Sequence, residues 1–81
     1  MKYIVFSDMT ACIFWNHVSH KAMAANRPVK SAGFCMLETT RNSFNDIRLR
    51  YCSCFGRSDS LGVESDPEDS KILAEMFMGM N

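Results

Sequence analysis

The side chains with the widest chemical repertoire in this chain of 81 residues are two histidines and four cysteines. His17 and His20 lie three positions apart, so on one helix they could share a face and bind a metal with Cys12 or Cys35. Ser19 has the type of a helix N-cap, however, and as a cap it would leave His17 outside the helix. We therefore expect no metal site and no cofactor.

Nucleophilic catalysis has little local support. A cysteine or serine nucleophile needs a neighbouring base and a group that orients the base. Ser58 and Ser60 follow Gly56 but lack the second glycine of a nucleophile elbow. The four cysteines are expected to be reduced, because the first residues lack the long apolar segment of a secretory signal. We expect a protein without enzymatic activity, and a small metal- or cysteine-dependent enzyme is the third functional alternative.

Basic and hydroxyl side chains near residue 56 form a candidate site for an anion. Guanidinium groups, hydroxyls and the backbone N–H groups of a glycine turn can together hold a phosphate or a carboxylate. Asp59 in the same turn argues against such a site, and a hairpin turn with exposed polar residues explains the same sequence. The candidate ligand-binding residues are Arg48, Arg50, Arg57, Ser58 and Ser60.

The net charge is zero, but the charges are unevenly distributed. Basic residues predominate in residues 27–57 and acidic residues in residues 58–81. The two parts can compensate each other on the folded surface, or the basic part can face an anionic partner. A neutral domain with an acidic C-terminal part binds polyanions poorly, so we do not expect nucleic acid as a partner.

These side chains need a scaffold, and its clearest element is a strand at residues 46–55. The side chains alternate there with the period of two that is typical of a half-buried strand. The face expected in the core carries Ile47, Leu49, Tyr51, Ser53 and Phe55, and the opposite face carries Arg48, Arg50, Cys52 and Cys54.

The chain after this strand predicts a hairpin and a helix. Residues 56–59 have turn-forming types, and residues 60–63 can return as the partner strand. A helix can start at Ser65 with Glu68 in a capping box, or at Asp66 with Pro67 in the first helical position. Its apolar stripe must pack on the sheet and consists of Ile72, Leu73, Met76, Phe77 and Met80.

The N-terminal part supplies further strands. Residues 2–6 and 11–15 predict a hairpin, Ser19 caps a short helix at residues 20–26, and residues 29–37 predict a strand. Gly33 in that strand indicates a bulge or a close backbone approach. Residues 38–45 are polar and without periodicity, which predicts a loop. The expected fold is one α+β domain, residues 1–81, in two layers: an antiparallel sheet of four or five strands, in the order β-β-α-β-β-β-α, with the C-terminal helix packed on one face.

Methionine is frequent, with seven in the chain. Its flexible thioether adapts to irregular apolar surfaces and is typical of contacts between proteins. The candidate partner or dimer surface consists of Trp15, Met76, Met78 and Met80. A homodimer is expected, and simple packing in the core is the alternative role of the methionines.

The run from Cys54 to Asp69 has the pattern C-x-G-x-S-x-S-L-x-x-x-S-x-P-E-D. This run resembles small uncharacterised proteins of bacteriophages and prophages, and residues 3–8 and 31–34 are similar to the same proteins. The resemblance implies no known activity and no functional residue. It implies a phage-type accessory protein, which we expect to bind and inhibit or sequester a host component, such as a defence factor, in the host cytoplasm.

The alternative function is a binding domain for a nucleotide or another small anion. The expected partner is accordingly a host protein or a small anionic host molecule. No apolar run approaches the roughly 18 residues that span a bilayer, so we expect no membrane partner.

Overall fold

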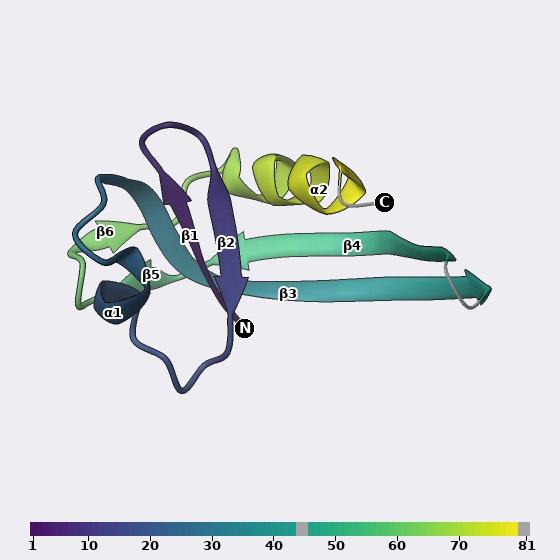
Figure 1. Cartoon of the computed structure of the whole chain (residues 1–81), viewed down its shortest axis with the longest axis horizontal. Coiled ribbons are helices and arrows are strands. Elements are labelled where there is room, and N and C mark those ends of the chain that lie inside the picture. The colour runs from purple at the N-terminus through teal and green to yellow at the C-terminus, as the bar shows by residue number, and fades with distance from the viewer. Residues whose placement is uncertain (44–45, 80–81) are drawn as a thin grey trace.

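The computed structural model describes the backbone of residues 1–43 and 46–79 and the side chains of residues 1–40 and 50–76. It has the α+β fold that the sequence predicts: an antiparallel sheet with the C-terminal helix packed against it (Figure 1). The elements are β1 (Lys2–Phe6), β2 (Ala11–Phe14), α1 (His20–Ala24), β3 (Val29–Ser43), β4 (Asp46–Phe55), β5 (Arg57–Ser58), β6 (Val63–Glu64) and α2 (Asp69–Gly79).

Four strands form the main sheet in the order β2-β1-β3-β4, and β5 and β6 form a separate two-stranded sheet. The sheet's two edges are therefore the short β2 and the longer β4. Figure 1 shows β3 and β4 running together as a ribbon that projects past the N-terminal hairpin, with α2 alongside it.

The predicted N-terminal hairpin and first helix are confirmed. Tyr3 pairs with Ile13 in the hairpin, and the Asp8 carboxylate accepts a hydrogen bond from the backbone N–H of Thr10 in the turn. Ser19 is the N-cap of α1, and its hydroxyl accepts from the backbone N–H of Ala22. The helix ends at Ala24, two residues earlier than predicted.

The expected loop at residues 38–45 is wrong for residues 38–43, because β3 continues to Ser43. These residues pair with β4, which provides the hydrogen bonds that make polar, non-periodic residues stable in a strand. Residues 44–45 lie outside the described residues. The predicted strand at residues 46–55 is confirmed with the same bounds.

The structure selects the second of the two predicted starts for α2. The Asp66 carboxylate accepts from the backbone N–H of Glu68, while the Asp69 carboxylate accepts from the backbone N–H of Asp66 at 2.8 Å. The bond from Asp66 to Asp69 is one half of a capping box, with aspartate in place of the usual glutamate or glutamine, while the Asp66 carboxylate caps Glu68 instead of Asp69. Leu73 of the predicted stripe is fully buried, and Ile72 and Met76 pack beside it.

The predicted hairpin after residue 55 is wrong in its register. β5 pairs with β6, Arg57 opposite Glu64, and the turn spans residues 59–62 rather than 56–59. Gly62 adopts φ +68° in this turn, a conformation that glycine takes without steric cost.

The core has one cluster on each face of the sheet. Between α2 and the sheet, Tyr3, Val5 and Cys35 of the strands pack with Leu73 of α2. On the other face lie Ile4, Phe6, Phe14 and Ala32, covered by Ala24 of α1, by Val63 of β6 and by Leu61 of the turn between β5 and β6. Together the two clusters anchor α2 on one face and α1 with the small sheet on the other.

The prediction of which face of β4 lies in the core is wrong. Tyr51 and Phe55 are about half exposed, whereas Cys52 and Cys54 turn toward α2 and pack on its cluster. The register with β3 is the cause: it pairs Cys54 with the buried Cys35, so both thiols lie on the helix-covered face. The side chains of Ile47 and Leu49 lie outside the described residues.

Candidate binding surface

An apolar surface lies on the face of β3 and β4 opposite α2. The register places Phe34 opposite Phe55 and puts Met36 and Tyr51 further along the same face. Met36 is 60% exposed, Tyr51 51% and Phe55 49%. Phe34 is half-buried, and its ring stacks on Phe55 with a centroid distance of 6.2 Å. We call the surface formed by Phe34, Met36, Tyr51 and Phe55 the open face.

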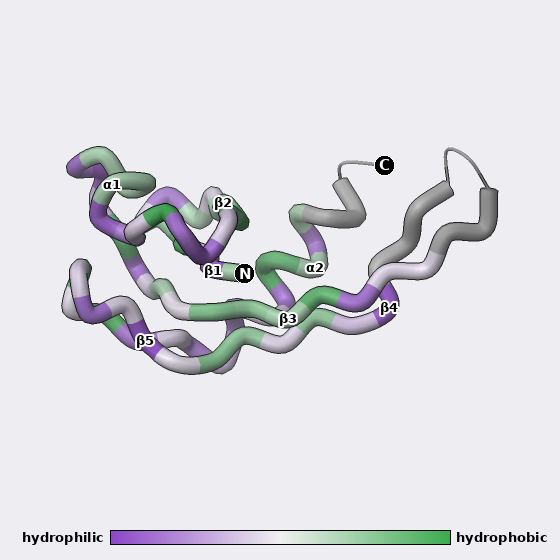
Figure 2. Tube along the Cα trace, turned by 90° about the horizontal axis from the view of Figure 1, so that it is seen from below, coloured by the Kyte–Doolittle hydropathy of each residue, from purple (hydrophilic) through white to green (hydrophobic). Residues whose placement is uncertain are grey.

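The open face has a structural reason to be uncovered. In Figure 2 α2 lies on one side of the β3–β4 ribbon, and within the described residues no helix or strand covers the other side along most of its length. The cover on that side, α1 with β5 and β6, packs on the N-terminal strands and the start of β3. Monomeric proteins seldom leave neighbouring large apolar side chains in water unless another molecule covers them.

The rim of the open face carries a pair of opposite charges. Arg50 Nη1 lies 3.6 Å from Glu38 Oε1, and both side chains are exposed. The pairing shifts at this point from Glu38 with Tyr51 to Thr39 with Leu49, so Arg50 is the extra residue of a bulge. A bulge redirects the side chains of its strand, which brings Arg50 within reach of Glu38.

One edge of the main sheet is β4, which pairs with β3 on one side only. The backbone N–H of Cys54 points away from β3 and donates to Ser70 Oγ of α2 at 3.0 Å. The helix thus satisfies this part of the edge. The rest of an edge strand offers backbone donors and acceptors to another chain.

The candidate anion-binding residues do not form one site. Ser58 is buried, and its hydroxyl accepts from the backbone N–H of Leu61. Arg50 lies in β4 at the rim of the open face, whereas Arg57 lies in the small sheet. The backbone of Arg48 pairs with Thr40, and its side chain lies outside the described residues.

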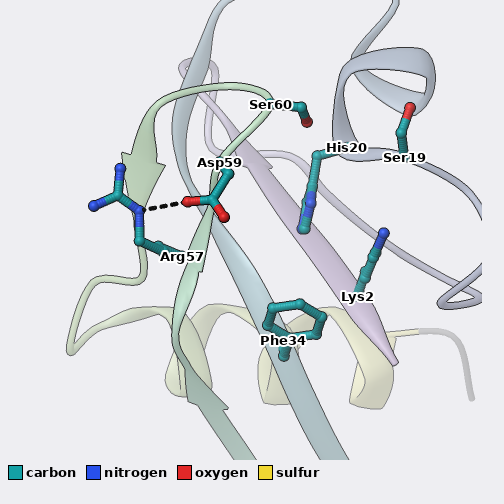
Figure 3. A pocket seen from close by; sticks show the side chains of 7 residues that line it. All are labelled: Lys2, Ser19, His20, Phe34, Arg57, Asp59 and Ser60. Atoms are coloured by element: carbon teal, nitrogen blue, oxygen red, sulfur yellow. Dashed lines mark ion pairs between the residues drawn. The ribbon is translucent and has the colours of Figure 1, made fainter.

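Arg57 and Ser60 do line a common pocket of about 260 Å³ (Figure 3). The other lining residues are Asp59 of the same turn and Lys2, Ser19, His20 and Phe34, which the sequence did not connect with this site. Their positions in four different elements and loops leave no local sequence signal. Because Phe34 also belongs to the open face, the pocket adjoins that surface.

Most polar groups around this pocket already have partners. Arg57 Nε lies 3.0 Å from Asp59 Oδ1, and its Nη1 lies 3.9 Å from Glu64 Oε1. Lys2 Nζ donates to the backbone oxygen of Val18 at 2.9 Å. These partners offset the positive charge that an anion would need, and they favour a structural role for the turn.

His20 has a structural role at the back of the pocket. Its ring is buried between Phe14 and Phe34 in edge-to-face contacts, and Nε2 donates to the backbone oxygen of Gly33 at 2.8 Å. An Nε2–H group engaged in this way has no lone pair for a metal. Among the described residues, no group of three or more histidine, cysteine or acidic side chains could hold a metal ion.

The predicted partner residues are spread over two elements. Trp15 follows β2 and is 66% exposed. Met76 is half-buried and packs on the cluster under α2, as the alternative role in the core implies. Met78 lies in α2 with its side chain outside the described residues, and Met80 also lies outside them.

The cysteines have the character of buried thiols. All four are free, and burial is the main cause that raises the pKa of each. The pKa of Cys54 is raised to about 12, with the neighbouring Cys52 and Cys35 contributing. A thiol with a raised pKa holds little thiolate at neutral pH and is a poor nucleophile.

Comparison of the chain with protein-family models, curated proteins and solved structures finds no match. None of the described helices is long and apolar enough to cross a membrane. Among the described residues, the open face is the most distinctive feature of the surface.

Proposed function

We propose that this chain is a non-enzymatic binding protein whose open face recognises a protein partner. The observation that carries the proposal is the exposure of Met36, Tyr51 and Phe55 together on one face of the sheet. Aromatic and methionine side chains are enriched at protein interfaces because they contribute a large contact area. The charged pair of Glu38 and Arg50 at the rim matches the usual anatomy of an apolar centre with a polar border.

The resemblance of residues 54–69 to small phage and prophage proteins suggests the kind of partner. We propose a protein of the bacterial host, such as a defence factor, which the chain inhibits or sequesters in the host cytoplasm. Burial of most of the reactive groups supports a role in binding rather than catalysis. The competing possibility is that a second copy of the chain binds the open face and forms a homodimer.

Affinity measurements on open-face variants test this proposal. The full tagged chain and the variants Tyr51→Ala and Met36→Glu are used to retain proteins from bacterial lysate, and bound proteins are quantified by mass spectrometry. Truncation of a central interface tyrosine costs about 2 kcal/mol or more, which corresponds to a roughly 30-fold loss of affinity. We expect both variants to lose the same retained protein.

The matched control is Met9→Glu, which changes another exposed methionine, in the turn between β1 and β2. It should retain the partner as the unchanged chain does. If the control and the open-face variants lose the partner equally, or if neither loses it, recognition by the open face is wrong. Light scattering of the purified chain separates a homodimer from a host complex.

A small anion in the pocket of Lys2, Arg57 and Ser60 is the second candidate ligand. Two cationic side chains and a hydroxyl line this one cavity, and an anion there would have to compete with Asp59 for Arg57. Titration calorimetry with inorganic phosphate and with a nucleoside monophosphate tests this function. Binding that Arg57→Ala abolishes and Arg50→Ala leaves intact would support it, while the absence of heat with both ligands would exclude it.

A further inference from the structure

Three of the four cysteines gather under α2. Cys35 of β3 is only 3% exposed, and Cys52 and Cys54 of β4 are half-buried on the same face of the sheet. The fourth cysteine, Cys12, packs in the cluster on the opposite face.

Cys35 and Cys54 lie directly opposite each other in the register of β3 and β4. The backbone N–H and C=O of Cys35 point away from β4. The N–H donates to the oxygen of Met1 at 2.8 Å, and the carbonyl oxygen accepts from the Met1 nitrogen at 3.2 Å. The backbone N–H of Cys54 likewise points away from β3, toward Ser70. The two cysteines therefore form a non-hydrogen-bonded pair of the antiparallel ladder.

This position suits a disulfide. In a non-hydrogen-bonded pair the Cα atoms lie about 4.5 Å apart, and a disulfide requires about 4.4–6.8 Å. The Cβ atoms of such a pair are also at their closest. Cys52 and Cys54, by contrast, follow each other at i and i+2 along one extended strand, and Cys52 pairs with Leu37.

We propose that Cys35 and Cys54 are a reversible thiol pair that closes to a cross-strand disulfide when the protein meets a disulfide oxidant such as oxidised glutathione. The bond would fasten the edge strand β4 to β3 at the base of the ribbon that carries the open face. It leaves the open face itself uncovered, because both sulfur atoms lie on the α2 side. The proposal is independent of which partner the open face binds.

The reaction is a two-step exchange. The more exposed Cys54 loses its proton and attacks one sulfur of oxidised glutathione; that S–S bond breaks, and one reduced glutathione leaves with a proton. The Cys35 thiolate then attacks Sγ of Cys54, the mixed disulfide breaks, and a second reduced glutathione leaves. The two cysteines together lose two electrons and two protons, which one oxidised glutathione gains.

The buried setting makes this exchange slow at neutral pH. Burial raises the pKa of both thiols, so the thiolate that attacks is scarce until the pH becomes alkaline. The rate of closure should therefore rise steadily between neutral and alkaline pH. A slow exchange preserves the free thiols through brief exposure to an oxidant and responds to sustained exposure.

The test is oxidation of the purified full chain with oxidised glutathione, followed by mass spectrometry of the intact protein and of its peptides. We expect the mass of a monomer that has lost two hydrogen atoms, a link between Cys35 and Cys54, a raised midpoint of thermal unfolding, and full reversal by dithiothreitol. Mixed glutathione adducts alone, or a link through Cys12 or between two chains, would overturn the proposal.

Serine variants assign the bond. Cys52→Ser and Cys12→Ser should still close the bridge, whereas Cys54→Ser should not. Circular dichroism verifies that each variant is folded; if Cys54→Ser does not fold, fragmentation of the linked peptide from the Cys52→Ser protein identifies the bridged pair. A bridge that is lost in the folded Cys52→Ser variant contradicts the assignment.

Discussion

A single buried carboxylate joins α2 to the sheet. Asp69 is fully buried and accepts hydrogen bonds from the hydroxyl of Tyr3, from Ser31 Oγ at 2.8 Å, and from the backbone N–H of Asp66. Lys30 Nζ lies 3.9 Å away and contributes a positive charge. A buried carboxylate is tolerated when it is satisfied in this way, and here one side chain both caps the helix and fixes it to β1 and β3.

Removal of this carboxylate should strongly destabilise the fold. Asp69→Ala leaves the buried hydroxyls of Tyr3 and Ser31 without their acceptor and removes half of the capping box, so we expect the free energy of unfolding to fall by about 2–4 kcal/mol. Urea denaturation measures the change. Asp59→Ala, at an exposed ion pair with Arg57, should change it by about 0.5 kcal/mol or less. Equal effects would refute the role of Asp69.

The buried acids with raised pKa values predict alkaline sensitivity. Burial raises the pKa of Tyr3, and the Asp69 carboxylate adds to the effect; the pKa of Cys54 is raised from 9.0 to about 12. Both groups bind their proton more tightly in the folded state, so their stabilising effect is complete below pH 9. The effect of Cys54 is lost as the pH rises toward 12, and that of Tyr3 begins to fall above pH 10. Urea denaturation across this range should show falling stability, with a smaller slope for Cys54→Ala. An unchanged slope in that variant would contradict the assignment to Cys54.

At the scale of elements, the sequence predicts which helices and strands form better than it predicts which of their faces are covered. The strand at residues 46–55 follows from its alternation, and α1 follows from the Ser19 cap, because both signals are local. The buried face of β4 depends on its register with β3, which aligns Cys54 with Cys35; a period of two defines two faces without saying which one is covered. Tyr51 and Phe55 were therefore expected in the core, although they lie on the open face.

The pocket beside the open face could likewise be predicted only where its residues are neighbours in the sequence. Arg57 and Ser60 are close in sequence, and the turn that carries them was indicated by their types. Lys2 and Phe34 join them only because β1, β3 and the small sheet meet there, and no local pattern reports such a meeting. No local pattern predicts the extension of β3 through the polar residues 38–43, because the hydrogen bonds that stabilise it come from β4.

The junction of β3 with the end of β4 depends on Gly33. A Cβ atom added at Gly33 would lie 2.5 Å from the backbone oxygen of Phe55, and a backbone atom has little freedom to move aside. This confirms the predicted close backbone approach. Gly33→Ala should therefore lower the free energy of unfolding by about 1–3 kcal/mol, the usual effect of overpacking. Thermal unfolding measures it.

Gly62→Ala is the matched control, because a Cβ atom there meets nothing within 4 Å and only the positive φ is strained. It should cost about 1 kcal/mol. If Gly33→Ala is as stable as the unchanged chain, the two strands separate more easily than the packing at this junction implies.

At the scale of the whole molecule, the faces of the sheet are covered unevenly by other elements. The N-terminal strands are packed on both faces, whereas the β3–β4 ribbon has α2 on one face and the open face on the other (Figures 1 and 2). The elongated shape, 39 × 24 × 20 Å, extends this ribbon into the surroundings. We interpret the molecule as a compact base that presents a ribbon to a partner.

Photo-crosslinking in bacterial cells tests this interpretation most directly. A benzophenone amino acid replaces Tyr51 in the full chain, and a second version replaces Met23, an exposed residue of α1 that is not part of the open face. The account predicts one discrete crosslinked host protein from position 51 and none from position 23. No crosslink from position 51, or the same crosslinked proteins from both positions, would contradict recognition by the open face.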